Sequence, residues 1–128
     1  MKALTAEWVK KAEGDLYSCL REVRARRHPN PDSGCFHAQQ CAEKYLKARL
    51  QEAGVAFPKT HDLLDLLKRV LGVEPTWVTL SAQLTQLVNY AVVFRYPGVS
   101  ASKADARKAL VASRAVRRVV RKSLGLKD

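Results

Sequence analysis

Two groups of polar residues carry the side chains in this sequence that could do chemistry. The first group lies on one stretch of chain and ends in a histidine; its members are Gln39, Gln40, Glu43, Lys44, Lys47 and His61. The second is the pair Arg95 and Tyr96, which precedes a Pro-Gly turn. Lysine and arginine bind phosphate, and carboxylates and imidazoles transfer protons. Both groups are therefore candidates for the recognition of an anionic ligand.

Two residues of the first group are expected to point inward. At about 100° per residue, Gln39 and Glu43 fall in the same arc of a helix as Phe36, Leu46 and Leu50, which the helix should bury. Burying them without partners would cost on the order of 1–3 kcal/mol for the amide, and more for the carboxylate. The rest of the chain, or a partner, must therefore satisfy both side chains.

Two interpretations of this region remain open. Glu43 and Lys47 are four residues apart, in the order that favours a helical ion pair. One interpretation is a structural polar network that satisfies the buried groups; its expected members are Asp15, Gln39, Gln40 and Glu43, with Lys44, Lys47 and His61 at its margin. The other is a pocket that receives a phosphate, or an acidic side chain of a partner, through Lys44 and Lys47.

The composition is basic but otherwise ordinary. The 23 Lys and Arg residues exceed the 12 Asp and Glu residues, which gives a net charge of +11. Such a chain attracts polyanions or acidic proteins, unless the charge serves only solvation. No apolar run approaches the roughly 20 residues that span a bilayer, and charges interrupt the first residues, so we expect no membrane segment, no signal peptide and a cytoplasmic protein. The three cysteines are expected to be reduced core residues.

Almost every segment has helical periodicity, and Pro and Gly clusters divide the chain into pieces. We expect helices over residues 3–27, 32–54, 61–71, 74–95 and 100–124. Thr60 is the expected cap of the third and shortest helix. These elements predict a single domain over residues 1–128: an all-α, up-and-down antiparallel four-helix bundle with one additional short helix. Two long apolar faces, together with small residues of the second helix, would permit a homodimer; the small residues are Ala38, Ala42 and Ala48.

The last helix has the clearest division between a charged and an apolar face. Five basic residues lie within roughly 60° of one another on a helical wheel; they are Lys103, Arg107, Arg114, Arg118 and Arg121. We interpret this basic ridge either as a solvated face or as an anion-binding surface. It contains no aromatic residue on which a base could stack.

Familiar catalytic and metal-binding motifs are missing. The sequence has no Gly-rich phosphate loop, HExxH or CxxC motif, and no residues are ordered as a Ser-His-Asp triad. We therefore expect neither a metal nor a cofactor, and no hydrolase built on a nucleophile.

The segment FHAQQCAEKYLKARL, followed by FPKTHDL and FRYPG, resembles the stand-alone prokaryotic type of HEPN domain (higher eukaryotes and prokaryotes nucleotide-binding). Ala12-x-x-Asp15-Leu16 in the first helix adds to the resemblance. It implies a small helical bundle, commonly homodimeric and often encoded beside a minimal nucleotidyltransferase. It also implies a two-component system of toxin–antitoxin type, with nucleotide or RNA as the ligand.

The resemblance also implies a degenerate ribonuclease motif. Family members that cleave RNA carry an arginine followed, after four to six residues, by a histidine. Arg95 matches the arginine, but Ser100, Ala101 and Ser102 occupy the positions where the histidine should stand. The expected function is therefore a binding and interaction module. The alternatives are a metal-independent ribonuclease that uses Arg95 and a purely structural helical dimer.

Overall fold

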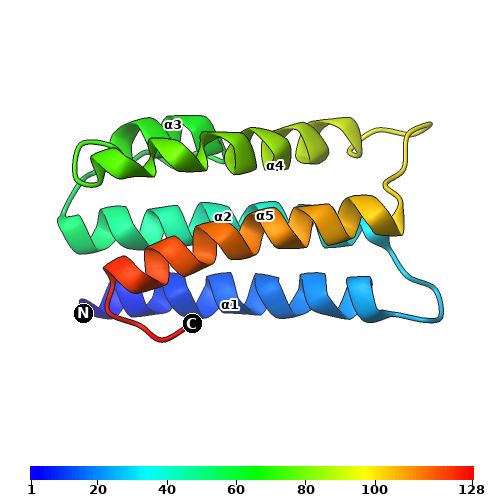
Figure 1. Cartoon of the computed structure of the whole chain (residues 1–128), viewed down its shortest axis with the longest axis horizontal. Helices are drawn as coiled ribbons and strands as arrows, with labels where there is room; N and C mark the ends of the chain where they lie inside the picture. The colour runs from blue at the N-terminus through cyan, green and yellow to red at the C-terminus, as the bar shows by residue number, and fades with distance from the viewer.

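The structure, a computed structural model, describes residues 1–128 and contains only helices and connecting segments (Figure 1). In chain order the elements are α1 (Ala3–Arg24), α2 (Pro31–Ala53), α3 (Leu63–Val70), the 3-10 helix η1 (Pro75–Leu80), α4 (Ser81–Val93) and α5 (Lys103–Ser123). The all-α prediction is confirmed. None of these helices combines the length and the apolar character that crossing a membrane requires.

α2 is the central element of the fold. It packs against α1, α3, α4 and α5. In Figure 1, α1 lies on one side of the α2–α5 pair and the layer of α3 and α4 lies on the other. The four long helices α1, α2, α4 and α5 alternate in direction along the chain. A polar side chain on α2 can therefore reach partners in every layer.

Local capping interactions set the ends of the long helices. The Asn30 side chain accepts a hydrogen bond from the backbone N–H of Ser33, and α2 ends at Gly54, whose φ of 71° is in the left-handed region. Ser102 and Asp105 form a capping box at the start of α5. This helix, expected from residue 100, therefore begins after the Ser102 cap.

Several predicted helix boundaries were wrong. α1 ends at Arg24, three residues before the predicted end. Thr60 does not cap α3; Asp62 accepts from the backbone N–H groups of Leu64 and Asp65, so the helix begins at Leu63. The segment from Pro75 begins as the 3-10 helix η1, and α4 ends at Val93.

The core differs from the helical-wheel prediction at its edges. Phe36, predicted to be buried, is 49% exposed. In α1, Leu4 is 55% exposed and the neighbouring Thr5 is buried. The expected dimer residues Ala38, Ala42 and Ala48 are at most 1% exposed. That basis for a homodimer was wrong, because these alanines pack inside their own chain.

The three cysteines are buried and free of disulfides, as predicted. Burial raises the pKa of the Cys19 thiol to about 11, and that of Cys35 and of Cys41 to about 12. These thiols therefore behave as small apolar core residues and not as nucleophiles.

Glu13 joins three helices. Its carboxylate accepts two hydrogen bonds from Arg117 of α5, at 2.8 and 2.9 Å, and one from the hydroxyl of Tyr45 of α2 at 2.6 Å. Arg121 lies 3.7 Å away. Burial alone would raise the pKa of Glu13, but the bonds from Arg117 and Tyr45 and the two positive charges outweigh it and lower the pKa. Glu13 therefore acts as a charged tether between α1 and the α2–α5 pair.

Replacing Glu13 by glutamine should lower the melting temperature by a few degrees at neutral pH, because Arg117 loses its partner charge. Since folding depresses the pKa of Glu13, its contribution to stability is present above the ordinary value of 4.5 and is lost as the pH falls through the lowered value. The variant should therefore lose less stability on acidification than the unaltered protein. Thermal denaturation followed by circular dichroism measures both effects. The exposed carboxylate Glu7 supplies the control, and an equal loss in Glu7→Gln would contradict the tether.

Candidate functional site

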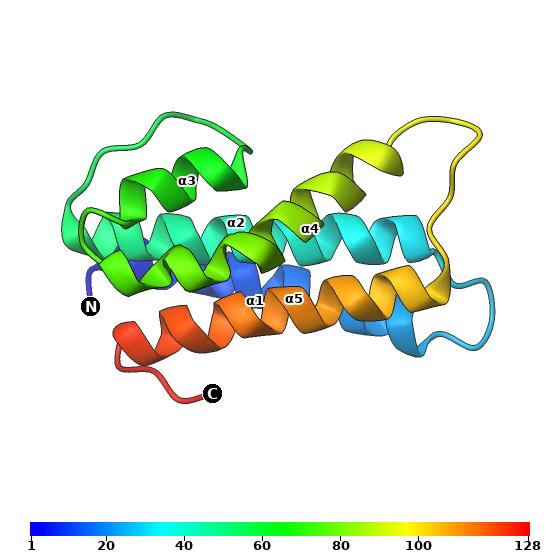
Figure 2. The ribbon, with the colours of Figure 1, turned by 45° about the horizontal axis from the view of Figure 1, so that its top comes forward.

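A groove of about 590 Å³ opens between α2, the start of α3 and the second half of α4. Figure 2 shows α4 crossing over α2 at an angle, with α3 next to it. The polar residues that line the groove are Gln39, Gln40, His61, Asp62 and Arg95. The groove thus brings members of both sequence-predicted groups to one place, although 56 positions separate Gln39 from Arg95.

Beneath the polar wall of the groove lies a buried carboxylate. The Glu43 side chain is 3% exposed, and its two oxygens bind different side chains: Oε1 lies 3.0 Å from Nδ1 of His61, and Oε2 accepts from Nζ of Lys47 at 3.1 Å. Nε2 of Gln39 and Nε2 of Gln40 also donate to Oε1, both at 3.4 Å. Four donors surround this charge and compensate for the water that it loses on burial.

The two glutamines complete the network. Nε2 of Gln40 donates to Oε1 of Gln39 at 2.7 Å, and Nε2 of Gln39 donates to the backbone carbonyl of His61 at 3.2 Å. The amide of Gln39 therefore has both its donor and its acceptor satisfied. These bonds join α2 to the segment that leads into α3, which fixes the position of His61.

His61 is the most exposed member of this network. Its side chain is 80% exposed while Nδ1 contacts Glu43. Because a carboxylate accepts, this contact assigns the ring proton to Nδ1 and leaves Nε2 open toward a ligand. A buried carboxylate thus orients an imidazole at the edge of the groove.

Asp15 does not join this network. Its two oxygens bind His37 at 2.8 Å and Lys44 at 2.6 Å. Lys47, besides its contact with Glu43, lies over the ring of Trp8, with 5.4 Å from Nζ to the ring centroid. Both lysines that were expected to flank a phosphate pocket are therefore engaged by carboxylates of their own chain.

Arg95 and Tyr96 occupy different surroundings. Arg95 lines the groove, and its side chain is exposed. Tyr96 is 64% exposed and lies outside the lining of the groove. Of this pair, only Arg95 belongs to the candidate site.

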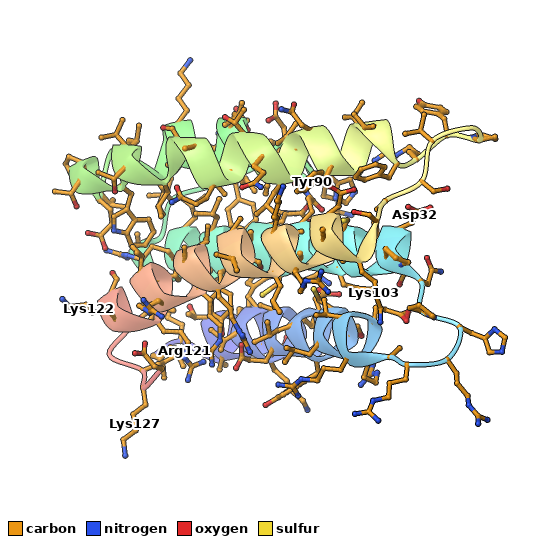
Figure 3. The ribbon with its side chains drawn as sticks, turned by 45° about the vertical axis from the view of Figure 1, so that its right-hand side comes forward. Asp32, Tyr90, Lys103, Arg121, Lys122 and Lys127 are labelled. Atoms are coloured by element: carbon orange, nitrogen blue, oxygen red, sulfur yellow. The ribbon has the colours of Figure 1, made fainter.

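The predicted basic ridge divides into two parts. Nζ of Lys103 donates to the backbone carbonyl of Ala25 at 2.8 Å, and Nη1 of Arg121 donates to the hydroxyl of Tyr45 at 3.1 Å. Figure 3 shows the side chains of Lys103 and Arg121 on the side of α5 that faces α1. The other three members, like Lys103, are exposed; they are Arg107, Arg114 and Arg118.

Sequence reasoning missed several residues of the groove. Asp62 follows His61 directly, but its carboxylate also caps α3. The apolar lining includes Phe36, Leu64 and Val92, which are 49%, 41% and 54% exposed. Phe36 lies four residues before Gln40, so both project from one side of α2. That spacing was the available signal for its place in the groove.

Replacing Glu43 by alanine should lower the melting temperature by several degrees, because Lys47 would remain buried without its counter-charge. The double variant Glu43→Ala/Lys47→Met should recover part of this loss, because it removes the unpaired charge as well. Differential scanning calorimetry of the three proteins measures both changes. A fully stable Glu43→Ala protein that has lost ligand binding would instead make Glu43 a binding residue.

Comparison with known proteins agrees with these features. A family model described as HEPN domain matches residues 5–123, nearly the whole chain. A search of curated proteins and a search of solved structures each found no match. The resemblance noted from the sequence motifs is confirmed, and the chain belongs to the HEPN domain family.

Proposed function

We propose that this chain is a nucleotide- or RNA-binding interaction module that takes up a phosphate-bearing ligand in the groove between α2, α3 and α4. The observation that carries the proposal is the groove itself, in which Arg95 of the segment after α4 lies with His61 of the segment before α3. An exposed guanidinium binds a phosphate through two parallel N–H groups. HEPN membership supports nucleotide or RNA as the ligand class.

The groove also offers apolar contacts to a ligand. Phe36, Leu64 and Val92 leave apolar surface exposed on three different helices around it. A nucleobase or a ribose would cover this surface and gain the free energy of apolar burial. A phosphate near Arg95 and a base against these side chains together describe a nucleotide unit.

Arg95→Ala should weaken the binding of ATP or of a fluorescently labelled RNA oligonucleotide about tenfold or more, because a charge-assisted hydrogen bond to phosphate is lost. Isothermal titration calorimetry and fluorescence anisotropy measure the two affinities. Lys68→Ala is the matched control, because Lys68 is an exposed cation of α3 that does not line the groove. Equal affinities of Arg95→Ala and the unaltered protein would contradict a ligand site at Arg95.

A second candidate function, metal-independent RNA cleavage, is favoured by the Glu43–His61 contact. The linear motif lacks a histidine after Arg95, but His61 supplies an imidazole in the same groove. Nε2 of His61 would accept the proton of a ribose 2′-hydroxyl as its oxygen attacks the adjacent phosphorus and the bond to the 5′-oxygen breaks. The products would be a 2′,3′-cyclic phosphate and a 5′-hydroxyl, the leaving oxygen taking a proton from water.

The same variants test this second function. RNA incubated with the purified protein and EDTA should be cleaved, and cleavage should be lost in Arg95→Ala and in His61→Ala but not in Lys68→Ala. Added imidazole should restore part of the activity of His61→Ala, which a purely structural histidine would not allow. Intact RNA with the unaltered protein would exclude cleavage and leave the binding module.

The family resemblance further supports a homodimer and a minimal nucleotidyltransferase as the partner, in a system of toxin–antitoxin type. The monomer would keep the single-domain, up-and-down four-helix bundle with one short helix predicted from the sequence. The exposed apolar residues Val93, Tyr96 and Val99, at and just after the end of α4, are available for such contacts.

Light scattering should give twice the mass of the chain for the purified protein. Co-expression with a nucleotidyltransferase encoded beside it should give a larger complex. A protein that stays monomeric in both experiments would contradict this assembly.

A further inference from the structure

A second surface, on the side of the molecule where α1 meets α5, carries its own set of exposed charged and aromatic residues. Two contacts fix how the helices lie against each other: Lys103 with the carbonyl of Ala25, and Arg117 with Glu13. These contacts place the two helices side by side, in antiparallel directions, along the stretch between the two contacts. The residues between Glu13 and Ala25 on α1 therefore lie beside those between Lys103 and Arg117 on α5.

This register brings Tyr17 of α1 level with Arg114 of α5. Tyr17 is four residues after Glu13, so it lies one turn further along the same flank of α1. Arg114 is three residues before Arg117, the partner of Glu13. The charge of Arg114 also acts on Cys19, where it opposes the increase in the pKa of the thiol that burial causes. Tyr17 and Arg114 therefore flank the same seam.

The exposed cations along this seam come from both helices. They are Arg21 and Arg24 of α1 and Arg114 and Arg118 of α5. Glu13, the carboxylate in the seam, is already bound by Arg117 and is close to Arg121. The four exposed guanidinium groups therefore keep their full positive field for an external anion.

Tyr17 supplies the aromatic ring that the basic ridge of α5 lacks. Its side chain is 57% exposed, and it lines a shallow pocket of about 400 Å³ together with Leu20, Arg21 and Arg24. An exposed ring among arginines can stack on a nucleobase, a contact worth about 1–3 kcal/mol for each base. Stacking of this kind requires a base with a free face, which a duplex does not present on its outside.

We propose that the seam between α1 and α5 binds single-stranded nucleic acid, with a base on Tyr17 and phosphates on Arg114 and Arg118. Arginine provides affinity without regard to sequence, and the ring makes the surface prefer unpaired strands. The seam and the groove of Arg95 lie on different helices, so neither site requires the other.

The test uses fluorescence anisotropy of a labelled oligouridylate with the full chain. Tyr17→Ala should weaken binding about tenfold, whereas Tyr17→Phe should bind almost as the unaltered protein does, because the ring remains. Arg114→Ala/Arg118→Ala should reduce the slope of log affinity against log salt by about 1.4, which is about 0.7 for each lost phosphate contact. Thermal melts of each variant should match the unaltered protein, because all three side chains are exposed.

Matched controls separate the seam from general charge. Lys11→Ala/Lys68→Ala removes the same two charges from exposed positions outside the seam, and should change affinity much less. The proposal would be overturned if Arg114→Ala/Arg118→Ala and Lys11→Ala/Lys68→Ala lost equal affinity, or if Tyr17→Ala kept full affinity. Either result would leave a non-specific polyanion surface. Equal binding of duplex RNA or of an acidic peptide would also overturn it. A loss in Arg95→Ala without one in Tyr17→Ala would assign the oligonucleotide to the groove alone.

Discussion

The structure depends most on one buried negative charge, the carboxylate of Glu43 in the central helix α2. A carboxylate that is 3% exposed is tolerated only if donors replace its water, and here Lys47, His61 and two glutamine amides do so. That requirement fixes which side of α2 faces the α3 segment. It also draws His61 to the edge of the groove. Stability and the geometry of the candidate site therefore rest on the same set of hydrogen bonds.

A second carboxylate, Glu13, has the same role on the opposite side of α2. Together with Arg117 and Tyr45 it connects α1 to α2 and α5. The carboxylates of Glu43 and Glu13 together bind most of the cations that point into the protein. The arginines that remain exposed are consequently those of the outer surfaces, and both proposed ligand surfaces draw on them. The positive charge of the outer surfaces therefore comes from those cations that bind neither carboxylate.

Helical periodicity was sufficient to predict an all-α fold and the inward position of Gln39 and Glu43. It could not show where a helix meets its neighbours. Phe36 lies on the predicted inner arc of α2, but no helix covers that end of the arc, so its ring remains half exposed. A helical wheel likewise grouped Arg121 with Arg114, because the wheel contains no information about Glu13 on another helix. The site itself required Arg95 and His61 to line one groove, and only the tertiary packing of α3 and α4 brings them there. The HEPN motifs, in contrast, were recognisable directly, because several of them occur in the expected order.

The attachment of α4 to the rest of the molecule has a consequence for the groove. Only Leu84 and Leu87 of this helix are buried, and its last residues, Val92 and Val93, are exposed. Helices held by little buried apolar surface open more readily than the core does. A ligand that contacts both α2 and the segment after α4 would oppose this opening in proportion to its concentration and affinity. Ligand binding in the groove would then be detected as slower hydrogen exchange of the amides of α4. The exchange of amides in the core would not change.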